Sequence, residues 1–237
     1  MSLAQVSVDT DIQQRWILRR YMDLPKLLDM LHSRSLYFRR ADSFADRLEG
    51  ALFPLLRASM NSAHAAGDIG TNADYFYQRS RIGSFVNCWT RSAKDSMAHW
   101  QIYAGVCSGV VVTTTVDRLI RTALTWERDV IVHRVRYVDH LKVKDYVIGR
   151  YSDVLQFKHE AYKHENEVRV IVPQQGDGWE SNPIELRLKV PDLDTLVRSI
   201  VVAPEASNEF YVAIKDMCSR YGLKAPVRRS KLAYVPV

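Results

Sequence analysis

Apolar residues recur along the chain in short β-branched or aromatic runs and in longer stretches with helical spacing. The short runs predict strands, at residues 16–21, 35–39, 84–89, 109–115, 130–138, 168–172, 184–190, 199–203 and near 227. The longer stretches predict helices, at residues 24–33, 52–66, 73–82, 96–104, 116–126, 151–164 and 208–221. Because strands and helices interleave without a regular alternation, we expect an α+β fold with one mixed, twisted sheet flanked by helices.

The sequence contains no feature that divides it into separate domains. No repeat, low-complexity tract or linker interrupts the 237 residues, a length that suits one large domain. We therefore expect a disordered segment over residues 1–14 and a single domain over residues 15–237. The polar start lacks the apolar core of a signal peptide, and the longest apolar runs fall far short of the ~20 residues that a membrane helix needs. We expect no membrane association.

The cysteine content and the net charge indicate the cellular compartment and the kinds of binding partner to expect. The three cysteines, Cys88, Cys107 and Cys218, are odd in number and widely spaced, which favours free thiols and a cytoplasmic protein. The net charge of +6 is compatible with a plain basic protein or with an anionic partner, such as a nucleotide, a phosphorylated small molecule or a nucleic acid. The basic residues lie in scattered pairs rather than in a dense stripe, and nothing in the sequence indicates the oligomeric state.

Several common catalytic signatures are absent. The chain contains no GxGxxG, GxxxxGK[ST] or GxSxG motif. His159-Glu160 followed by His164 approaches the HExxH pattern, but a spacing of five separates the two histidines by about 140° around a helix. They do not share one metal-binding face, so this pattern predicts no metal site. Cys88 lies inside a predicted strand, where a packed thiol is more common than a nucleophile.

The most informative stretch runs from Glu165 to Val172. Side chains alternate along a strand, so the valines of this segment are expected to face the core while Glu165, Glu167 and Arg169 face the other way. Two carboxylates over one cleft are able to orient a substrate hydroxyl and stabilise developing positive charge. The alternative is a solvated sheet face carrying a weak Glu–Arg pair.

Two further groups of residues are candidates for ligand binding. Tyr37 lies on the second predicted strand, and Asp46 and Glu49 lie in the polar loop that follows it, where functional residues often occur. Trp100 and Tyr103 are three residues apart on a short predicted helix and would share a face. Such a pair packs in a core or forms a wall against which a base or a nicotinamide ring stacks.

The ordered set of these motifs resembles a bacterial family, the domain of unknown function 2971. The resemblance covers roughly residues 16–230 and rests on Phe44-Ala45-Asp46-x-x-Glu49, Cys88-Trp89-Thr90, Trp100-x-x-Tyr103 before Gly109, Lys158-His159 and Glu165-x-Glu167-x-Arg169. The chain departs from the family where Ala45-Asp46-Arg47 replaces the usual Asn-Asp-Pro, and where His99 replaces the Met before the Trp. The family has no assigned activity, so this resemblance implies a fold and little else.

A second, weaker similarity is to ADP-ribosyltransferases. Arg20 on an early strand, Cys88-Trp89-Thr90 at the end of a central strand and Glu165-x-Glu167 at a late strand start follow the layout of those enzymes, although the usual Ser-x-Ser is missing. The similarity implies NAD as substrate, with Arg20 on the pyrophosphate, Trp100 or Tyr103 on the nicotinamide and Glu167 on the ribose.

Three kinds of function remain open from sequence. The first is an NAD-using ADP-ribosyltransferase-like enzyme with its catalytic residues in one cleft. The second is a non-catalytic module that binds a nucleotide or nucleic acid. The third is a hydrolase or nuclease with Asp46, Glu49 and the late glutamate pair around a divalent ion. Beyond these three, a structural or interaction role also stays open. We predict as catalytic Glu167, Glu165 and Arg20, and as ligand-binding Tyr37, Asp46, Glu49, Trp100, Tyr103 and Arg169.

Overall fold

The computed structural model describes residues 5–46, 48–143, 148–174 and 176–233. Its strands are β1 (Val6–Val8), β2 (Ile17–Met22), β3 (Ser35–Arg40), β4 (Ser84–Arg91), β5 (Val110–Thr115), β6 (Val130–Arg134), β7 (Arg136–Val138), β8 (Phe157–His159), β9 (Glu167–Pro173), β10 (Glu185–Lys189), β11 (Ser199–Val202) and β12 (Val227–Arg229).

The α-helices are α1 (Leu24–Ser33), α2 (Pro54–Ala66), α3 (Ala73–Ile82), α4 (Met97–His99), α5 (Val116–Ala123), α6 (Leu193–Leu196) and α7 (Asn208–Arg220). Short 3-10 turns are η1 (Ala41–Ser43), η3 (Tyr151–Gln156), η4 (Glu160–Glu165), η5 (Trp179–Ser181) and η6 (Lys231–Ala233), and η2 (Trp100–Ala104) is a π-helical turn.

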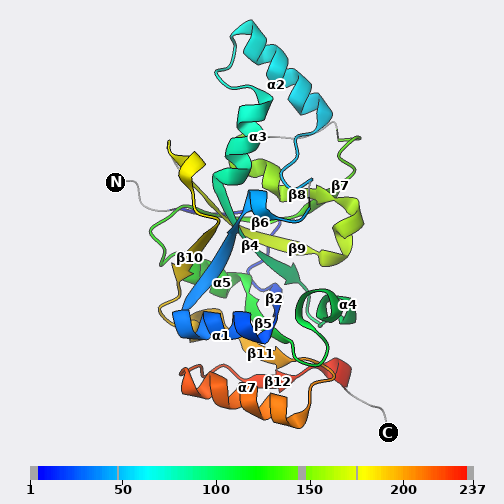
Figure 1. The fold of residues 1–237 in the computed structure, drawn as a ribbon, viewed down its shortest axis with the longest axis vertical. Helices are drawn as coiled ribbons and strands as arrows, with labels where there is room; N and C mark the ends of the chain where they lie inside the picture. Colours follow the sequence, from blue (N-terminus) through cyan, green and yellow to red (C-terminus); the bar gives the residue numbers. More distant parts are fainter. Residues whose placement is uncertain (1–4, 47, 144–147, 175, 234–237) are drawn as a thin grey trace.

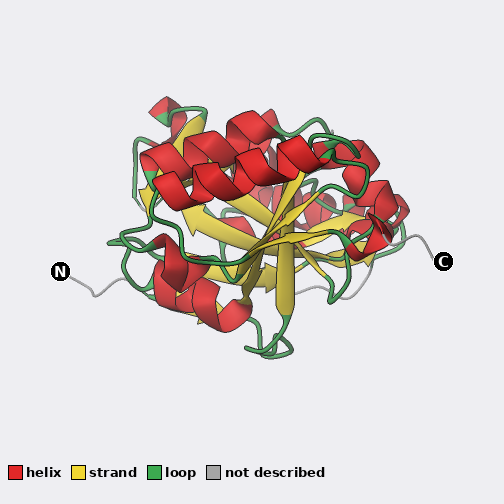
Figure 2. Cartoon of the chain, turned by 90° about the horizontal axis from the view of Figure 1, so that it is seen from below, coloured by secondary structure: helices red, strands yellow, loops and turns green. Residues whose placement is uncertain are grey.

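Ten of the described strands form one mixed sheet. Its order is β1-β6-β9-β4-β2-β5-β11-β12, while β3 pairs with β4 and carries β10 on its other edge. Helices lie on both sides of the twisted strands (Figure 2), and α2 and α3 extend away from the sheet at the top of Figure 1. The predicted α+β class with a mixed sheet flanked by helices is confirmed. None of the described helices is long and apolar enough to cross a bilayer.

The sheet forks at one edge of β4. Near its start, β4 pairs with β3, with Val86 opposite Arg39, and near its end it pairs with β2, with Thr90 opposite Arg19. Between these two points the edge of β4 pairs with neither strand. The fork therefore opens a gap in the sheet, and this gap positions the site described below.

The central strand β9 separates two clusters of buried side chains. Val168, Val170 and Val172 belong to the main hydrophobic core, whereas Ile171 packs in a smaller cluster on the opposite face. Burying each valine stabilises the fold by about 1.5 kcal/mol or more. Arg169 shares the face of Ile171, so the alternation predicted for this strand is confirmed from Glu167 onward.

Local signals in the sequence account well for α1. The side chain of Asp23 accepts a hydrogen bond from the backbone N–H of Lys26, and Pro25 occupies the first turn, where it disrupts no hydrogen bond. The helix ends at Ser33, and the capping residue Arg34 has a left-handed conformation. The predicted helix 24–33 is confirmed at both ends.

Several predicted elements differ from the structure. Residues 6–8, within the segment expected to be disordered, form β1, which pairs with β6, while residues 1–4 lie outside the described part. The predicted strand 130–138 is divided into β6 and β7. The predicted helix 151–164 is instead η3, β8 and η4, because Phe157–His159 pairs with β7. Tertiary pairing overrides helical spacing in this segment.

Candidate functional site

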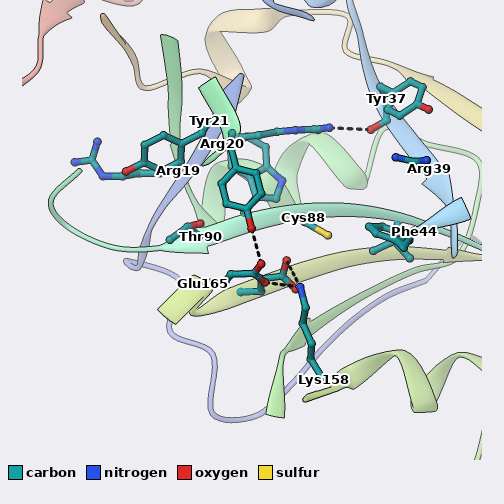
Figure 3. Close-up of a pocket in the computed structure, with 14 residues that line it drawn as sticks. Arg19, Arg20, Tyr21, Tyr37, Arg39, Phe44, Cys88, Thr90, Lys158 and Glu165 are labelled. Carbon is teal, nitrogen blue, oxygen red and sulfur yellow. Dashed lines mark hydrogen bonds and ion pairs between the residues drawn. The ribbon is translucent and has the colours of Figure 1, made fainter. Parts of the chain in front are cut away.

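A cavity of about 280 Å³ lies in the fork of the sheet (Figure 3). We call it the central cavity. Its walls come from β2, β3, β4, η2 and the β8–β9 region, which are far apart in sequence. The lining residues are Arg19, Arg20, Tyr21, Tyr37, Arg39, Phe44, Val86, Cys88, Trp89, Thr90, Tyr103, Lys158, Glu165 and Glu167.

One wall of the central cavity carries three arginines. Arg20 donates to the backbone carbonyl of Tyr37 at 3.3 Å, and Arg19 donates to the carbonyls of Ser92 and Ala93. Arg39 is exposed, with its guanidinium 5.9 Å from the ring of Phe44. Among the described residues, none of these three guanidinium groups forms an ion pair with a carboxylate. This wall therefore has positive charge available for an anionic ligand.

The opposite wall carries two buried glutamates. Glu165 accepts a hydrogen bond from the hydroxyl of Tyr103 at 2.5 Å and forms an ion pair with Lys158. The ammonium of Lys158 also lies 3.6 Å from Oε1 of Glu167. Each carboxylate has about four acceptor positions, so both retain capacity to accept hydrogen bonds from ligand hydroxyls.

The backbone at Asn166 explains how the two glutamates come to face one cavity. Glu165 ends η4 and Glu167 begins β9, so the two residues do not lie on one strand as the alternation predicted. Asn166 between them has a φ of 44°, in the left-handed region that asparagine tolerates better than most residues. Its side chain donates to the carbonyl of Arg91 at 2.6 Å, and its carbonyl accepts from the N–H of Arg91.

Behind Glu167 lies a fully buried ion pair. Arg169 donates from Nε to Oε2 of Glu167 at 2.9 Å, and its other nitrogens bind both carboxylate oxygens of Glu49. The carbonyl of Leu155 accepts a further hydrogen bond from Arg169 at 2.7 Å. Arg169 and Glu49 are each 1% exposed, so they act as a rigid support for Glu167 rather than as part of the cavity wall.

Electrostatic interactions keep two groups of this wall, Glu167 and Lys158, charged. Burial by itself would raise the pKa of Glu167, but the charges of Arg169 and Lys158 outweigh it and hold the pKa below the usual value. Burial would likewise lower the pKa of Lys158, yet the neighbouring carboxylates of Glu167 and Glu165 raise it above normal. Glu167 is therefore ionised and Lys158 protonated at neutral pH.

Burial is the main influence on two other groups of the cavity, Cys88 and Tyr103. Burial, more than the nearby carboxylate of Glu167, raises the pKa of the Cys88 thiol well above its usual range. Cys88 therefore stays protonated, which excludes a thiolate nucleophile at neutral pH. Burial and the hydrogen bond to Glu165 also raise the pKa of Tyr103. Tyr103 remains a hydrogen-bond donor over the physiological range.

A second cavity, which we call the adjoining cavity, shares Arg20, Tyr37 and Arg39 with the central one. Its volume is about 420 Å³. The remaining wall combines apolar side chains of β2, β3 and α1 with charged residues at its rim: Met22, Pro25, Lys26, Asp29, Met30, Ser35, Leu36 and Arg187. The two cavities thus meet at a pair of arginines.

Five of the nine predicted site residues line the central cavity: Arg20, Tyr37, Tyr103, Glu165 and Glu167. The other four, Asp46, Glu49, Trp100 and Arg169, lie outside that lining. Glu49 and Arg169 bind each other behind Glu167. Asp46 accepts a hydrogen bond from the backbone N–H of Leu48 at 2.9 Å and shapes its own loop.

Trp100 and Tyr103 do not share a face, contrary to the helical spacing. The chain forms a π turn here, in which Gly105 donates its N–H to the carbonyl of Trp100 five residues earlier. The wider turn places Trp100 in the core, with no exposed surface, packed edge-on against Tyr21. Tyr103 is 41% exposed and reaches the cavity.

Sequence reasoning did not select Arg19, Arg39, Phe44 or Lys158 as site residues. The sequence predicts a helix at Lys158. In the structure the residue lies on β8, and its side chain is buried beside the glutamates. Arg19 and Arg39 each stand next to a second arginine. The lining of the cavity includes Arg19, Arg20 and Arg39 but not Arg40, which only the fork of the sheet reveals. The pairs Arg19-Arg20 and Arg39-Arg40 were the available signal.

The described residues contain no group of three or more His, Cys, Asp or Glu side chains that could hold a metal ion. Within that part of the chain, the carboxylates invoked for a metal-dependent hydrolase do not converge. Both oxygens of Glu49 are bound by Arg169, and Asp46 lies apart from the glutamate pair.

Comparisons with known proteins yield weak likenesses only. No family model matches the chain, and no curated protein matches it. The solved structure of Thermus sp. 2.9 DarT in complex with ADP-ribosylated ssDNA aligns with a TM-score of 0.46 and 8% identity over 94% of this chain and 98% of that chain. DarT in complex with NAD+ aligns with a TM-score of 0.44 and 9% identity, over 94% of this chain and 100% of that chain. Likeness at this level carries no argument about activity, and the resemblance to the domain of unknown function 2971 stays a prediction.

Proposed function

We propose that the chain is an NAD-using, ADP-ribosyltransferase-like enzyme whose active site is the central cavity. One observation carries the proposal: among the described residues, arginines that form no ion pair with a carboxylate face two buried glutamates across the same cavity, and Glu167 is ionised. The first feature suits a phosphorylated ligand. The second suits a reaction in which positive charge develops on a bound sugar.

The arrangement of the two cavities supports a dinucleotide as the ligand. NAD carries a pyrophosphate between two nucleosides. Arg20 and Arg39 line both cavities, so they would bind the pyrophosphate, with one nucleoside on either side. Tyr103 and Phe44 supply aromatic surface for the nicotinamide ring in the central cavity. The two volumes, about 280 and 420 Å³, together fall within the usual range for small-molecule pockets.

The glutamates would act on the nicotinamide ribose. Glu165 and Glu167 accept hydrogen bonds from the ribose hydroxyls, and the ionised Glu167 stabilises the positive charge that spreads over C1′ and the ring oxygen. The bond between C1′ and the nicotinamide nitrogen breaks, and its electron pair leaves with neutral nicotinamide. A lone pair of the acceptor, or of water, then forms the new bond to C1′, and the acceptor loses a proton.

Arg169 and Lys158 act on this chemistry through Glu167. Their charges hold its pKa down, so the carboxylate is ionised when the substrate arrives. The Arg169–Glu49 pair also fixes the carboxylate in position, which limits the reorganisation needed as charge develops. Tyr103 and Lys158 orient Glu165 in the same way.

The test is release of nicotinamide from NAD+, followed by chromatography, for the wild-type chain and for Glu167→Gln. We expect the substitution to lower the rate about a hundredfold or more, because it removes the stabilising charge. Glu185→Gln, which removes an exposed carboxylate on β10, is the matched control and should retain the wild-type rate. If the chain binds NAD+ saturably but releases no nicotinamide, it is not an enzyme of this kind but a nucleotide-binding module. Absence of both would remove the proposal.

A further inference from the structure

A third cavity lies at the other end of the strands that form the central one. The strand β9 begins at Glu167 in the central cavity and ends at Pro173, which lines this third cavity. Its volume is about 320 Å³, and its wall includes Arg79, Gly83, Ser84, Tyr151 and Ser152. We call it the rear cavity. The proposed function makes no use of it.

Arg79 supplies a largely buried positive charge to the rear cavity. Its side chain is 16% exposed, and its guanidinium lies 4.6 Å from the centre of the Tyr151 ring. Its nitrogens donate to the hydroxyl of Tyr75 at 3.1 Å and to the carbonyl of Gly176 at 3.0 Å. The nearest carboxylate among the described residues, that of Asp177, is fully exposed and 4.0 Å away. Arg79 is therefore fixed in place but weakly neutralised.

Ser152 supplies an unpaired hydroxyl to the same cavity. The residue is 2% exposed, and its Oγ has no hydrogen-bond partner among the described residues. A buried polar group without a hydrogen-bond partner destabilises the fold. Because Ser152 lines the rear cavity, its hydroxyl is a candidate donor to an acceptor placed there.

The other charged groups of this wall, Arg150 and Asp129, have partners of their own. Arg150 is half exposed and forms an ion pair with Asp153 at 3.2 Å. Asp129 accepts a hydrogen bond from the backbone N–H of Gln5 at 2.9 Å. Arg79 and Ser152 are therefore the donor groups of this wall that are available to a ligand. A guanidinium together with a hydroxyl is suited to bind an oxyanion.

We propose that the rear cavity is a binding site for a small oxyanion, a phosphate or a carboxylate, held by Arg79 and Ser152. The site is separate from the central cavity and does not depend on the proposed function. The anion would accept hydrogen bonds from the guanidinium and from the Ser152 hydroxyl, and the ring of Tyr151 would keep Arg79 in position.

The test is an NMR titration of the full chain with inorganic phosphate and, in a second arm, with malonate. The titration is carried out with the variant Arg20→Gln, because this substitution is expected to weaken anion binding in the central cavity. We expect saturable shifts of the amides of Gly83 and Ser152 with at least one of the two anions, and the arm that saturates identifies the chemistry.

The variants Arg79→Gln and Ser152→Ala should weaken this binding by more than about tenfold and by roughly fivefold respectively. Arg57→Gln removes an exposed arginine with the same change in net charge and is expected to bind as the parent does. The proposal is overturned if neither anion gives saturable shifts at these amides, or if both variants bind as tightly as Arg57→Gln. Ser152→Ala keeps the test decisive should Arg79→Gln not fold.

Discussion

The carboxylate of Glu49 binds the guanidinium of Arg169 through both oxygens, although 120 residues separate them in sequence. Each side chain is 1% exposed. This pair joins the loop after β3 to the centre of the sheet. It also holds Arg169 against Glu167, which faces the central cavity. The loop after β3 therefore helps to position Glu167 without lining the central cavity through Glu49.

Breaking this pair should destabilise the fold strongly. Glu49→Gln leaves the Arg169 charge buried with one carboxylate partner fewer, and loss of one partner of a buried pair costs about 3–5 kcal/mol. Urea denaturation measures the free energy of unfolding. Glu185→Gln, in the exposed pair with Arg187, is the control and should cost less than about 1 kcal/mol. Equal losses for the two variants would contradict a supporting role for the buried pair.

The lowered pKa of Glu167 predicts a specific pH dependence. A carboxylate with a depressed pKa in the folded state stabilises the fold above its unfolded pKa, about 4.3. That contribution is lost as the pH falls toward the folded value. The difference in unfolding free energy between the wild type and Glu167→Gln should therefore shrink as the pH falls below about 4.3. A difference that stays constant across this range would show that Glu167 has an ordinary pKa.

Asn166 should be sensitive to the shape of its substitute. Asn166→Ala keeps a Cβ in the left-handed region, which costs about 1–2 kcal/mol relative to glycine, and loses the hydrogen bond to the carbonyl of Arg91. Asn166→Gly loses the same hydrogen bond but adopts that backbone conformation freely. Urea denaturation should find the alanine variant less stable than the glycine variant by about 1 kcal/mol. The opposite order would argue against backbone strain at this position.

The three cysteines should differ in their reaction with iodoacetamide. Burial raises the pKa of Cys88 well above the usual range and that of Cys218 to about 11, so neither thiol ionises appreciably at neutral pH. Cys107 is exposed. Mass spectrometry of the native protein at pH 7.4, about physiological, should find the label on Cys107 before either of the others. Labelling of Cys88 as fast as Cys107 would indicate an accessible thiolate in the central cavity.

The sequence predicted the strands better than the site. Alternation along β9 placed the valines correctly because a buried strand keeps its period of two. It placed Glu165 on the right side for the wrong reason, since the turn at Asn166, and not the strand, directs that side chain. Local patterns do not encode such a turn strongly.

Long-range contacts account for most of the remaining differences. Glu49 and Arg169 were both predicted to bind a ligand, but they bind each other, and no spacing rule relates residues so distant in sequence. Trp100 lies in the core and not in the cavity, because the chain forms a π turn that helical periodicity does not predict. Lys158 was hidden inside a predicted helix because its strand forms only through pairing with β7.

The most direct test of the central claim is the affinity for NAD+ measured by isothermal titration calorimetry. Arg20→Gln should weaken binding at least about tenfold, because a hydrogen bond to a charged group contributes about 1.5–3 kcal/mol. Arg121→Gln removes the same charge from an exposed pair on α5 and should bind as the wild type does. Unchanged affinity in Arg20→Gln, or an equal loss in both variants, would show that the fork of the sheet is not where the dinucleotide binds.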